Sequence, residues 1–339
     1  MQSRANYHFS PSTGSGTALH SGTTLHSGTA LHSGTALHSV IILFVLTVAL
    51  TFCSCVPKHK GSTRLKVVAS VPVIYDWTRN LMNDSDNTNL FLNLIIKNGF
   101  NYHNLVPGVT EENLIDSANL LIYAGGESEK WIDEYVEKTS SEHPDRIVLR
   151  LFDYAQINDQ TEIDEHILIS PSQAVIFCNK ISEALCTLDS ENQALYKQCH
   201  EKYNQLLTIL DDTYKLQAQK TKDTVFIICD CMPFKALFNE YGFNYIAVYD
   251  YCPVIKTKQV ITVNLKEFGE KIDETGASAV YCFENSDKKL AKQVIANSKN
   301  PKCDTLVFDS MESLTLSQLF SGKNYIDIMR NNLTLLRPN

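Results

Sequence analysis

The sequence has fewer basic than acidic residues, no cysteine pair at CxxC spacing and no glycine between Gly126 and Gly242. Its formal net charge of -8 argues against nucleic acid as a partner, because contact with a phosphate backbone needs a basic surface. Eight scattered cysteines follow Cys55, and they predict neither a zinc ribbon nor a small disulfide scaffold. At 339 residues with 44% hydrophobic residues, the chain can bury the cores of two lobes.

The apolar segment at residues 40–52 is too short for a bilayer span, which needs about 20 such residues. It is typical of a signal-peptide core, although no basic region directly precedes it. It ends in Phe52-Cys53-Ser54-Cys55, which resembles the processing site of a bacterial lipoprotein with Cys55 as the acylated membrane anchor. An ordinary cleaved signal peptide is the alternative. We therefore treat residues 1–55, which include a histidine-bearing hexapeptide repeat, as a low-complexity and signal segment outside the fold.

After a polar linker at residues 56–64, strand-like and helix-like patterns alternate as in parallel-sheet proteins. The pattern predicts an α/β fold of two similar lobes, each a mostly parallel sheet flanked by helices. The N-terminal lobe covers residues 65–189, and the C-terminal lobe covers residues 220–339. The predicted strands are residues 65–71, 90–96, 120–123 and 146–151, then 224–229, 245–248, 279–283 and 305–308.

A long helix is predicted between the lobes, at residues 190–219, where nothing in the sequence breaks a helix. Ser190 and Gln193 have the spacing of a capping box. The apolar positions recur at helical spacing, and they are Leu195, Cys199, Tyr203, Leu206, Leu210 and Tyr214. The helix is long enough to run along both lobes as a spine that restricts hinge opening.

Four potential metal ligands follow strand-like segments, two in each half of the chain: His103, His166, Cys231 and Asp309. In open α/β sheets, ligands bind beyond the carboxyl ends of strands. We therefore expect the four side chains to converge on one cleft between the lobes. Two neutral imidazoles, a thiolate and a carboxylate would neutralise a dication and give the tetrahedral coordination of closed zinc sites. The thiolate favours zinc over manganese, which prefers harder oxygen ligands.

Both histidines have structural alternatives. His103 lies in a loop before Pro107-Gly108, and taken alone a histidine there is more often an ordinary surface residue than a ligand. His166 lies in Asp164-Glu165-His166, just before a predicted helix that Ser170 and Gln173 would cap, so it is also suited to a role in the cap region.

The two ligands predicted in the second lobe also have alternatives. Cys231 precedes a helix opened by Pro233, and a helix N-terminus favours the thiolate. It is otherwise a small buried cysteine, with Asp230 as a rival ligand. Asp309 closes a strand and would also suit a helix cap. Glu284 follows the preceding strand and is a reserve ligand or a partner of a ligand histidine.

These segments together resemble the zinc- and manganese-specific substrate-binding lipoproteins of bacterial ABC importers, over about residues 66–336. The segments that carry the resemblance are Asn101-Tyr102-His103, Asp164-Glu165-His166, Tyr241-Gly242, Asp309-Ser310-Met311 and a closing helix with Tyr325, Met329 and Asn332. Counting back from Tyr241-Gly242 by the family's interval reaches Cys231, where the family normally has histidine or glutamate. The resemblance implies two lobes joined by a long helix, and metal that is bound outside the membrane and delivered to a permease.

We therefore expect a monomeric zinc-binding protein that serves an ABC transporter permease. It is expected to be lipid-anchored in the cell envelope, on the outer face of the cytoplasmic membrane or in the periplasm. No catalysis is expected. A manganese-binding protein of the same class is the first alternative. A thiol hydrolase with Cys231 as nucleophile and His166 as base is the second, but it lacks any local nucleophile motif.

Overall fold

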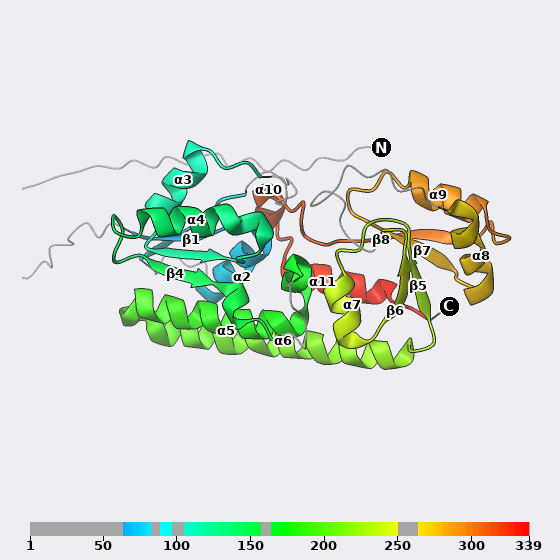
Figure 1. Ribbon diagram of the computed structural model, residues 1–339. Helices are drawn as coiled ribbons and strands as arrows, with labels where there is room; N and C mark the ends of the chain where they lie inside the picture. The colour runs from blue at the N-terminus through cyan, green and yellow to red at the C-terminus, as the bar shows by residue number, and fades with distance from the viewer. Residues whose placement is uncertain (1–63, 83–88, 97–104, 157–163, 250–263, 339) are drawn as a thin grey trace, which may run out of the picture. The chain divides into compact units, whose positions relative to one another are not determined.

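The computed structural model describes residues 64–82, 89–96, 105–156, 164–249 and 264–338 (Figure 1). The predicted signal segment, the anchor Cys55 and the ligand His103 lie outside these residues. Residues 62–339 form one compact unit, which contains both lobes. Within the described ranges, no helix combines the length and the apolar character that a bilayer span requires.

The first lobe holds a four-stranded parallel sheet in the order β2-β1-β3-β4. The strands are β1 (Leu65–Ala69), β2 (Leu90–Leu94), β3 (Leu120–Tyr123) and β4 (Ile147–Arg150). Its helices are α2 (Pro72–Met82), α3 (Val109–Asp116), α4 (Lys130–Thr139) and α5 (Pro171–Leu188), with short 3-10 turns at η2 (Glu127–Glu129), η3 (Leu151–Tyr154), η4 (Glu165–Ile169) and η5 (Ser190–Asn192). Helices α4 and α5 cover opposite faces of this sheet (Figure 1).

The second lobe repeats this arrangement, with the parallel order β6-β5-β7-β8. Its strands are β5 (Val225–Ile228), β6 (Asn244–Ala247), β7 (Ala279–Phe283) and β8 (Asp304–Phe308). Its helices are α7 (Lys235–Tyr241), α8 (Leu265–Thr275), α9 (Lys289–Ala296), α10 (Leu316–Phe320) and α11 (Tyr325–Leu335). The predicted fold of two similar parallel-sheet lobes is confirmed.

Both faces of the second sheet are buried, and alternate residues along β5 and the adjoining Cys229 pack in different cores. Ile227 and Cys229 pack in a small cluster with Ile272 of α8 and Val294 of α9. Phe226 and Ile228 point to the opposite face and belong to the main core, which continues into the first lobe. Burial on both faces explains why the strands have continuous apolar sequences instead of alternating ones.

Helix α6 (Gln193–Lys220) joins the lobes and spans about 42 Å at 1.5 Å per residue. It packs against α2 and α5 of the first lobe and against α7 and α11 of the second. The predicted apolar stripe is partly wrong: Leu206 is exposed, and the neighbouring Leu207 is buried in its place. The predicted capping box is also absent, because Ser190 begins the 3-10 turn η5 and α6 starts at Gln193 without a side-chain cap.

Contacts between α2 and the C-terminal segment also tie the lobes together. The Tyr325 amide donates to the buried carboxylate of Asp76 at 2.8 Å, and Arg79 donates to the carbonyl of Leu319 at 2.9 Å. Trp77 lies edge-on to the ring of Tyr325, with ring centroids 5.4 Å apart. The chain order reverses between β1 and β3 in one sheet and between β5 and β7 in the other. Ligand sites are expected beyond the strand ends at such points.

Candidate metal site

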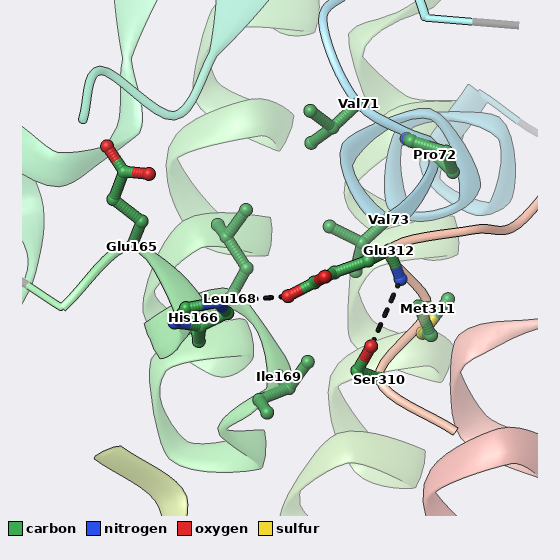
Figure 2. A pocket seen from close by; sticks show the side chains of 10 residues that line it. All are labelled: Val71, Pro72, Val73, Glu165, His166, Leu168, Ile169, Ser310, Met311 and Glu312. Atoms are coloured by element: carbon green, nitrogen blue, oxygen red, sulfur yellow. Dashed lines mark hydrogen bonds and ion pairs between the residues drawn. The ribbon is translucent and has the colours of Figure 1, made fainter. Parts of the chain in front are cut away.

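One pocket draws residues from segments far apart in the sequence (Figure 2). The turn after β1 contributes Val71, the 3-10 turn η4 contributes His166, and the loop after β8 contributes Met311 and Glu312. Two of these segments follow the ends of β1 and β8, and η4 precedes α5. Ligand sites of open α/β sheets are expected beyond such strand ends. His166 and Glu312 are the pocket's facing polar groups, and Figure 2 shows their side chains directed toward one another.

His166 is buried and is held on both ring nitrogens. Its Nδ1–H donates to Asp164 Oδ1 at 2.7 Å, and the same carboxylate oxygen accepts the backbone N–H of His166 at 3.0 Å. Nε2 lies 2.9 Å from Glu312 Oε1. An imidazole fixed through Nδ1 by a carboxylate presents Nε2 as a ligand, which is the usual arrangement of metal-binding histidines.

The two carboxylates determine the proton affinity of this imidazole. Burial acts to lower the pKa of His166, but the hydrogen bonds and charges of Asp164 and Glu312 outweigh burial and raise it to about 10. Burial acts to raise the pKa of Asp164, and its contacts with His166 bring it below the usual value. Without metal, His166 is therefore an imidazolium at neutral pH. A metal ion binding at Nε2 must displace its proton.

Glu312 is the residue that the sequence reasoning missed. It lies three positions after Asp309 in the loop that follows β8, and its carboxylate faces His166. Nε2 and Oε1 lie 2.9 Å apart, an ordinary hydrogen-bond distance, whereas two ligands about 2.0 Å from a tetrahedral zinc ion are about 3.3 Å apart, so the pair would have to separate slightly to admit the metal. The only sequence signal was a second carboxylate in the same loop, because the direction of each side chain depends on the loop conformation.

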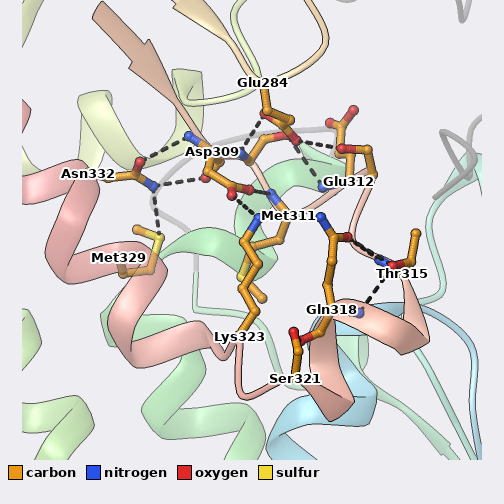
Figure 3. Close-up of polar contacts among 12 residues, drawn as sticks. Glu284, Asp309, Met311, Glu312, Thr315, Gln318, Ser321, Lys323, Met329 and Asn332 are labelled. Carbon is orange, nitrogen blue, oxygen red and sulfur yellow. Dashed lines mark hydrogen bonds and ion pairs between the residues drawn. The ribbon is translucent and has the colours of Figure 1, made fainter. Parts of the chain in front are cut away.

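Asp309 has a different environment, which Figure 3 shows. Its Oδ2 accepts from Lys323 Nζ at 2.6 Å, and its Oδ1 accepts the backbone N–H of Met311 at 2.9 Å. Its backbone N–H and carbonyl are both bonded by the side-chain amide of Asn332, at 3.0 and 2.8 Å. In this conformation Asp309 holds the loop together through its own carboxylate.

Glu284 braces the same loop from the end of β7. Its carboxylate accepts the Ser310 N–H at 2.9 Å and the Ser310 hydroxyl at 2.8 Å (Figure 3). Burial raises the pKa of Glu284, and the hydrogen bond from the Ser310 amide opposes this effect. Met311 has a φ of 64°, a left-handed conformation that is uncommon for a residue other than glycine. The polar contacts of Asp309 and Glu284 thus surround a strained turn that directs Glu312 into the pocket.

Cys231 lies three residues beyond β5 and is partly exposed. Its backbone N–H donates to Asp230 Oδ1 at 2.9 Å, and Phe283 N–H donates to Asp230 Oδ2 at 3.2 Å. The carboxylate of Asp230, the rival ligand, is therefore occupied by backbone amides from two neighbouring strand ends.

The structure brings His166 together with Glu312, but the predicted four-ligand set stays a prediction. His103 is outside the described residues. Among the residues that are described, no group of three or more His, Cys, Asp or Glu side chains is placed to hold a metal ion. His166 and Glu312 face each other in the pocket and could hold two of the four positions of a zinc site.

Residues 67–338 match the family described as "Zinc-uptake complex component A periplasmic". The chain is 23% identical to the zinc-binding lipoprotein AdcA of Streptococcus pneumoniae over 310 residues, which cover 87% of this chain and 60% of AdcA. It is 22% identical to the high-affinity zinc uptake system protein ZnuA of Bacillus subtilis over 288 residues, which cover 81% of this chain and 87% of that protein.

Among solved structures, the Zn(II)-bound ZnuA-like domain of S. pneumoniae AdcA is similar, with a TM-score of 0.67 and 21% identity. The match covers 80% of this chain and 97% of that domain. At this identity the likeness establishes the fold. The chain spans about 60% of the length of the AdcA relative and most of the length of the ZnuA relative.

Proposed function

Because the chain belongs to the family of periplasmic zinc-uptake components, which are transport proteins and not enzymes, we propose that it captures zinc outside the cytoplasm and delivers it to an ABC importer. The observation that carries this proposal is the buried His166, oriented by Asp164 and facing Glu312 across 2.9 Å. A histidine nitrogen and a carboxylate oxygen suit zinc. The zinc-binding names of the relatives support the same metal.

We propose His103, His166 and Cys231 as ligands, together with one carboxylate from the loop after β8. The contact with His166 favours Glu312, and Asp309 is the alternative that the sequence predicts. Manganese is the alternative metal, and a site that includes the Cys231 thiolate favours zinc. We also propose that the protein is a monomer, is anchored through a lipid on Cys55 and docks on the importer's permease.

Titration of the purified protein with zinc, in competition with a chromophoric chelator, tests this function. One tight zinc site per chain is expected, and manganese should compete only at much higher concentration. Replacing Cys231 with alanine should weaken zinc binding, because the site loses its thiolate. A protein without a tight zinc site would refute the proposal, and an unchanged affinity in Cys231→Ala would remove that residue from the ligand set.

The choice between the two carboxylates predicts different effects for two matched substitutions. Glu312→Gln should weaken zinc binding at least about 10-fold, because it removes the charge that faces His166. Asp309→Asn keeps an acceptor for the Met311 amide and loses only the charge paired with Lys323, so we expect an effect below about threefold. Dissociation constants from the same competition assay check this. The reverse order of effects would identify Asp309 as the ligand.

The proton on His166 predicts a pH dependence of zinc affinity. The pKa of this imidazole is raised to about 10 in the metal-free protein, so zinc displaces one proton from it at every pH below that value. The affinity should therefore fall at least about tenfold for each pH unit of acidification near neutral pH. Calorimetric titration in buffers of different ionisation enthalpy measures the released protons. Release of no proton near pH 7 would contradict the protonated state.

A further inference from the structure

Helix α7 of the second lobe lies against the segment of the first lobe that carries His166. It contacts the 3-10 turn η4, which holds His166, and η4 leads directly into α5. In the chain, α7 begins four residues after Cys231. The position of α7 therefore determines how the His166 segment of the first lobe lies relative to the Cys231 loop of the second lobe.

The end of α7 supplies an acidic group to the start of α5. Ser170 is the N-cap residue of α5, yet its side chain makes no capping hydrogen bond. Its hydroxyl donates instead to one carboxylate oxygen of Glu240, and the hydroxyl of Ser172 donates to the other. The first turn of α5 has no acidic residue of its own. Glu240 thus brings a negative charge to the positive end of an 18-residue helix from across the lobe boundary.

Two hydrogen bonds of Tyr241 and one charge interaction of Lys235 favour the same orientation of α7. Tyr241, next to Glu240, accepts a hydrogen bond from the backbone of Ser172 and donates its hydroxyl to Asp211 of α6 at 2.8 Å. At the other end of α7, the positive charge of Lys235 acts on Asp164, the carboxylate that orients His166. Each end of α7 therefore faces an opposite charge or dipole of the first lobe, so sliding or rotation of the helix would separate both pairs.

We propose that Glu240 is a positioning residue for zinc binding: by holding α7 on the N-terminal end of α5, it fixes the His166 segment relative to the loop that carries Cys231. This inference rests on the proposed function. The carboxylate of Glu240 accepts hydrogen bonds from Ser170 and Ser172, neither of which is a proposed ligand, so its effect is transmitted through η4 and α7. Loss of the contact leaves each ligand intact but widens the range of distances between them. The consequence falls mainly on zinc release, because a loosened site loses bound metal faster.

The test compares zinc affinity and release in Glu240→Ala, Glu240→Gln and Ser172→Ala with the wild-type protein. Glu240 is exposed, so the net contribution of an ordinary hydrogen bond applies; it predicts a dissociation constant about five- to tenfold higher in Glu240→Ala, with most of the change in the release rate. Glu240→Gln keeps one acceptor oxygen, so its dissociation constant should lie between those of the wild-type protein and Glu240→Ala. Release is followed by stopped-flow transfer of zinc to an excess of chelator. Glu274→Ala is the matched control, because Glu274 is an exposed glutamate of α8 that pairs within its own helix with Lys271.

Double substitution separates positioning from a general loss of stability. Glu240→Ala combined with Ser172→Ala should weaken zinc binding by less than the product of the two single effects, because both remove one contact. Ser172→Thr retains the hydroxyl and should release zinc at a near wild-type rate, and its comparison with Ser172→Ala tests the contact even if Glu240→Ala folds poorly. Release rates and affinities within twofold of wild type in Glu240→Ala, Glu240→Gln and Ser172→Ala would overturn the proposal. Absence of tight zinc binding by the wild-type protein would instead refute the proposed function.

Discussion

Replacing His166 with alanine is expected to weaken zinc binding by more than about 100-fold. Loss of a residue that merely orients a ligand costs about 10- to 100-fold in metal affinity, and loss of the ligand itself should exceed this range. The substitution also removes the imidazolium that lies between the carboxylates of Asp164 and Glu312, so that their negative charges repel each other without compensation. The metal-free variant is therefore expected to be less stable than the wild-type protein. Competition titration with a chelator of known affinity measures the loss.

His143→Ala provides the matched control. His143 lies in the same lobe, is partly exposed and pairs with Asp116 at 3.3 Å, away from the residues that line the pocket. Its replacement should leave the zinc affinity unchanged. Circular dichroism of the metal-free proteins verifies that both variants fold. If folded His166→Ala bound zinc within about threefold of wild type, the metal would have to bind elsewhere, and the pocket would lose its proposed role.

Replacing Trp77 with alanine is expected to lower the free energy of unfolding by about 3–5 kcal/mol, the usual cost of removing a large buried aromatic side chain. Trp77 is fully buried and packs between Phe177 of α5 and Tyr325 of α11, with ring centroids 6.1 and 5.4 Å away. Because the two neighbours belong to different lobes, the cavity would weaken the joint between the lobes as well as the core. Urea denaturation of the metal-free protein measures the change.

Trp77→Phe is the companion variant. It retains an aromatic ring and removes the indole N–H, which finds no hydrogen-bond acceptor among the described residues. The loss of unfolding free energy should therefore be well below that of Trp77→Ala, at about 1–2 kcal/mol. A loss below about 1 kcal/mol in Trp77→Ala would mean that the core around this side chain collapses to fill the space, and that the joint between lobes depends on other contacts.

The repeated order of apolar and polar segments was sufficient to predict the two sheets. Residues 120–123 and 279–283 were predicted as strands with the observed bounds, because short apolar runs between polar turns have few alternatives. The sequence predicted less well which positions of a single helix are buried. Leu206 has the right spacing for the buried stripe of α6, yet Leu207 is buried instead, because the packing of neighbouring helices decides which adjacent positions are covered.

Ser170 illustrates the same limit at the site. The sequence predicts that Ser170 and Gln173 cap α5 through a capping box. In the structure the Ser170 hydroxyl bonds Glu240, and the Gln173 side chain bonds the backbone of Gln156. Both side chains therefore form hydrogen bonds with residues distant in the chain instead of the local capping bonds. A capping pattern predicts where a helix begins, and it does not determine which acceptor the hydroxyl will contact.

By itself, the sequence determined the two-lobed α/β architecture, the long connecting helix and the strand ends where ligands are sought, because these follow from local hydrophobic patterns. It also determined His166 as a candidate ligand. Only the tertiary structure placed Glu312, and not Asp309, against His166, and brought Glu240 onto α5. These contacts depend on a left-handed turn at Met311 and on the docking of two lobes, both of which arise from many long-range contacts that no local pattern encodes.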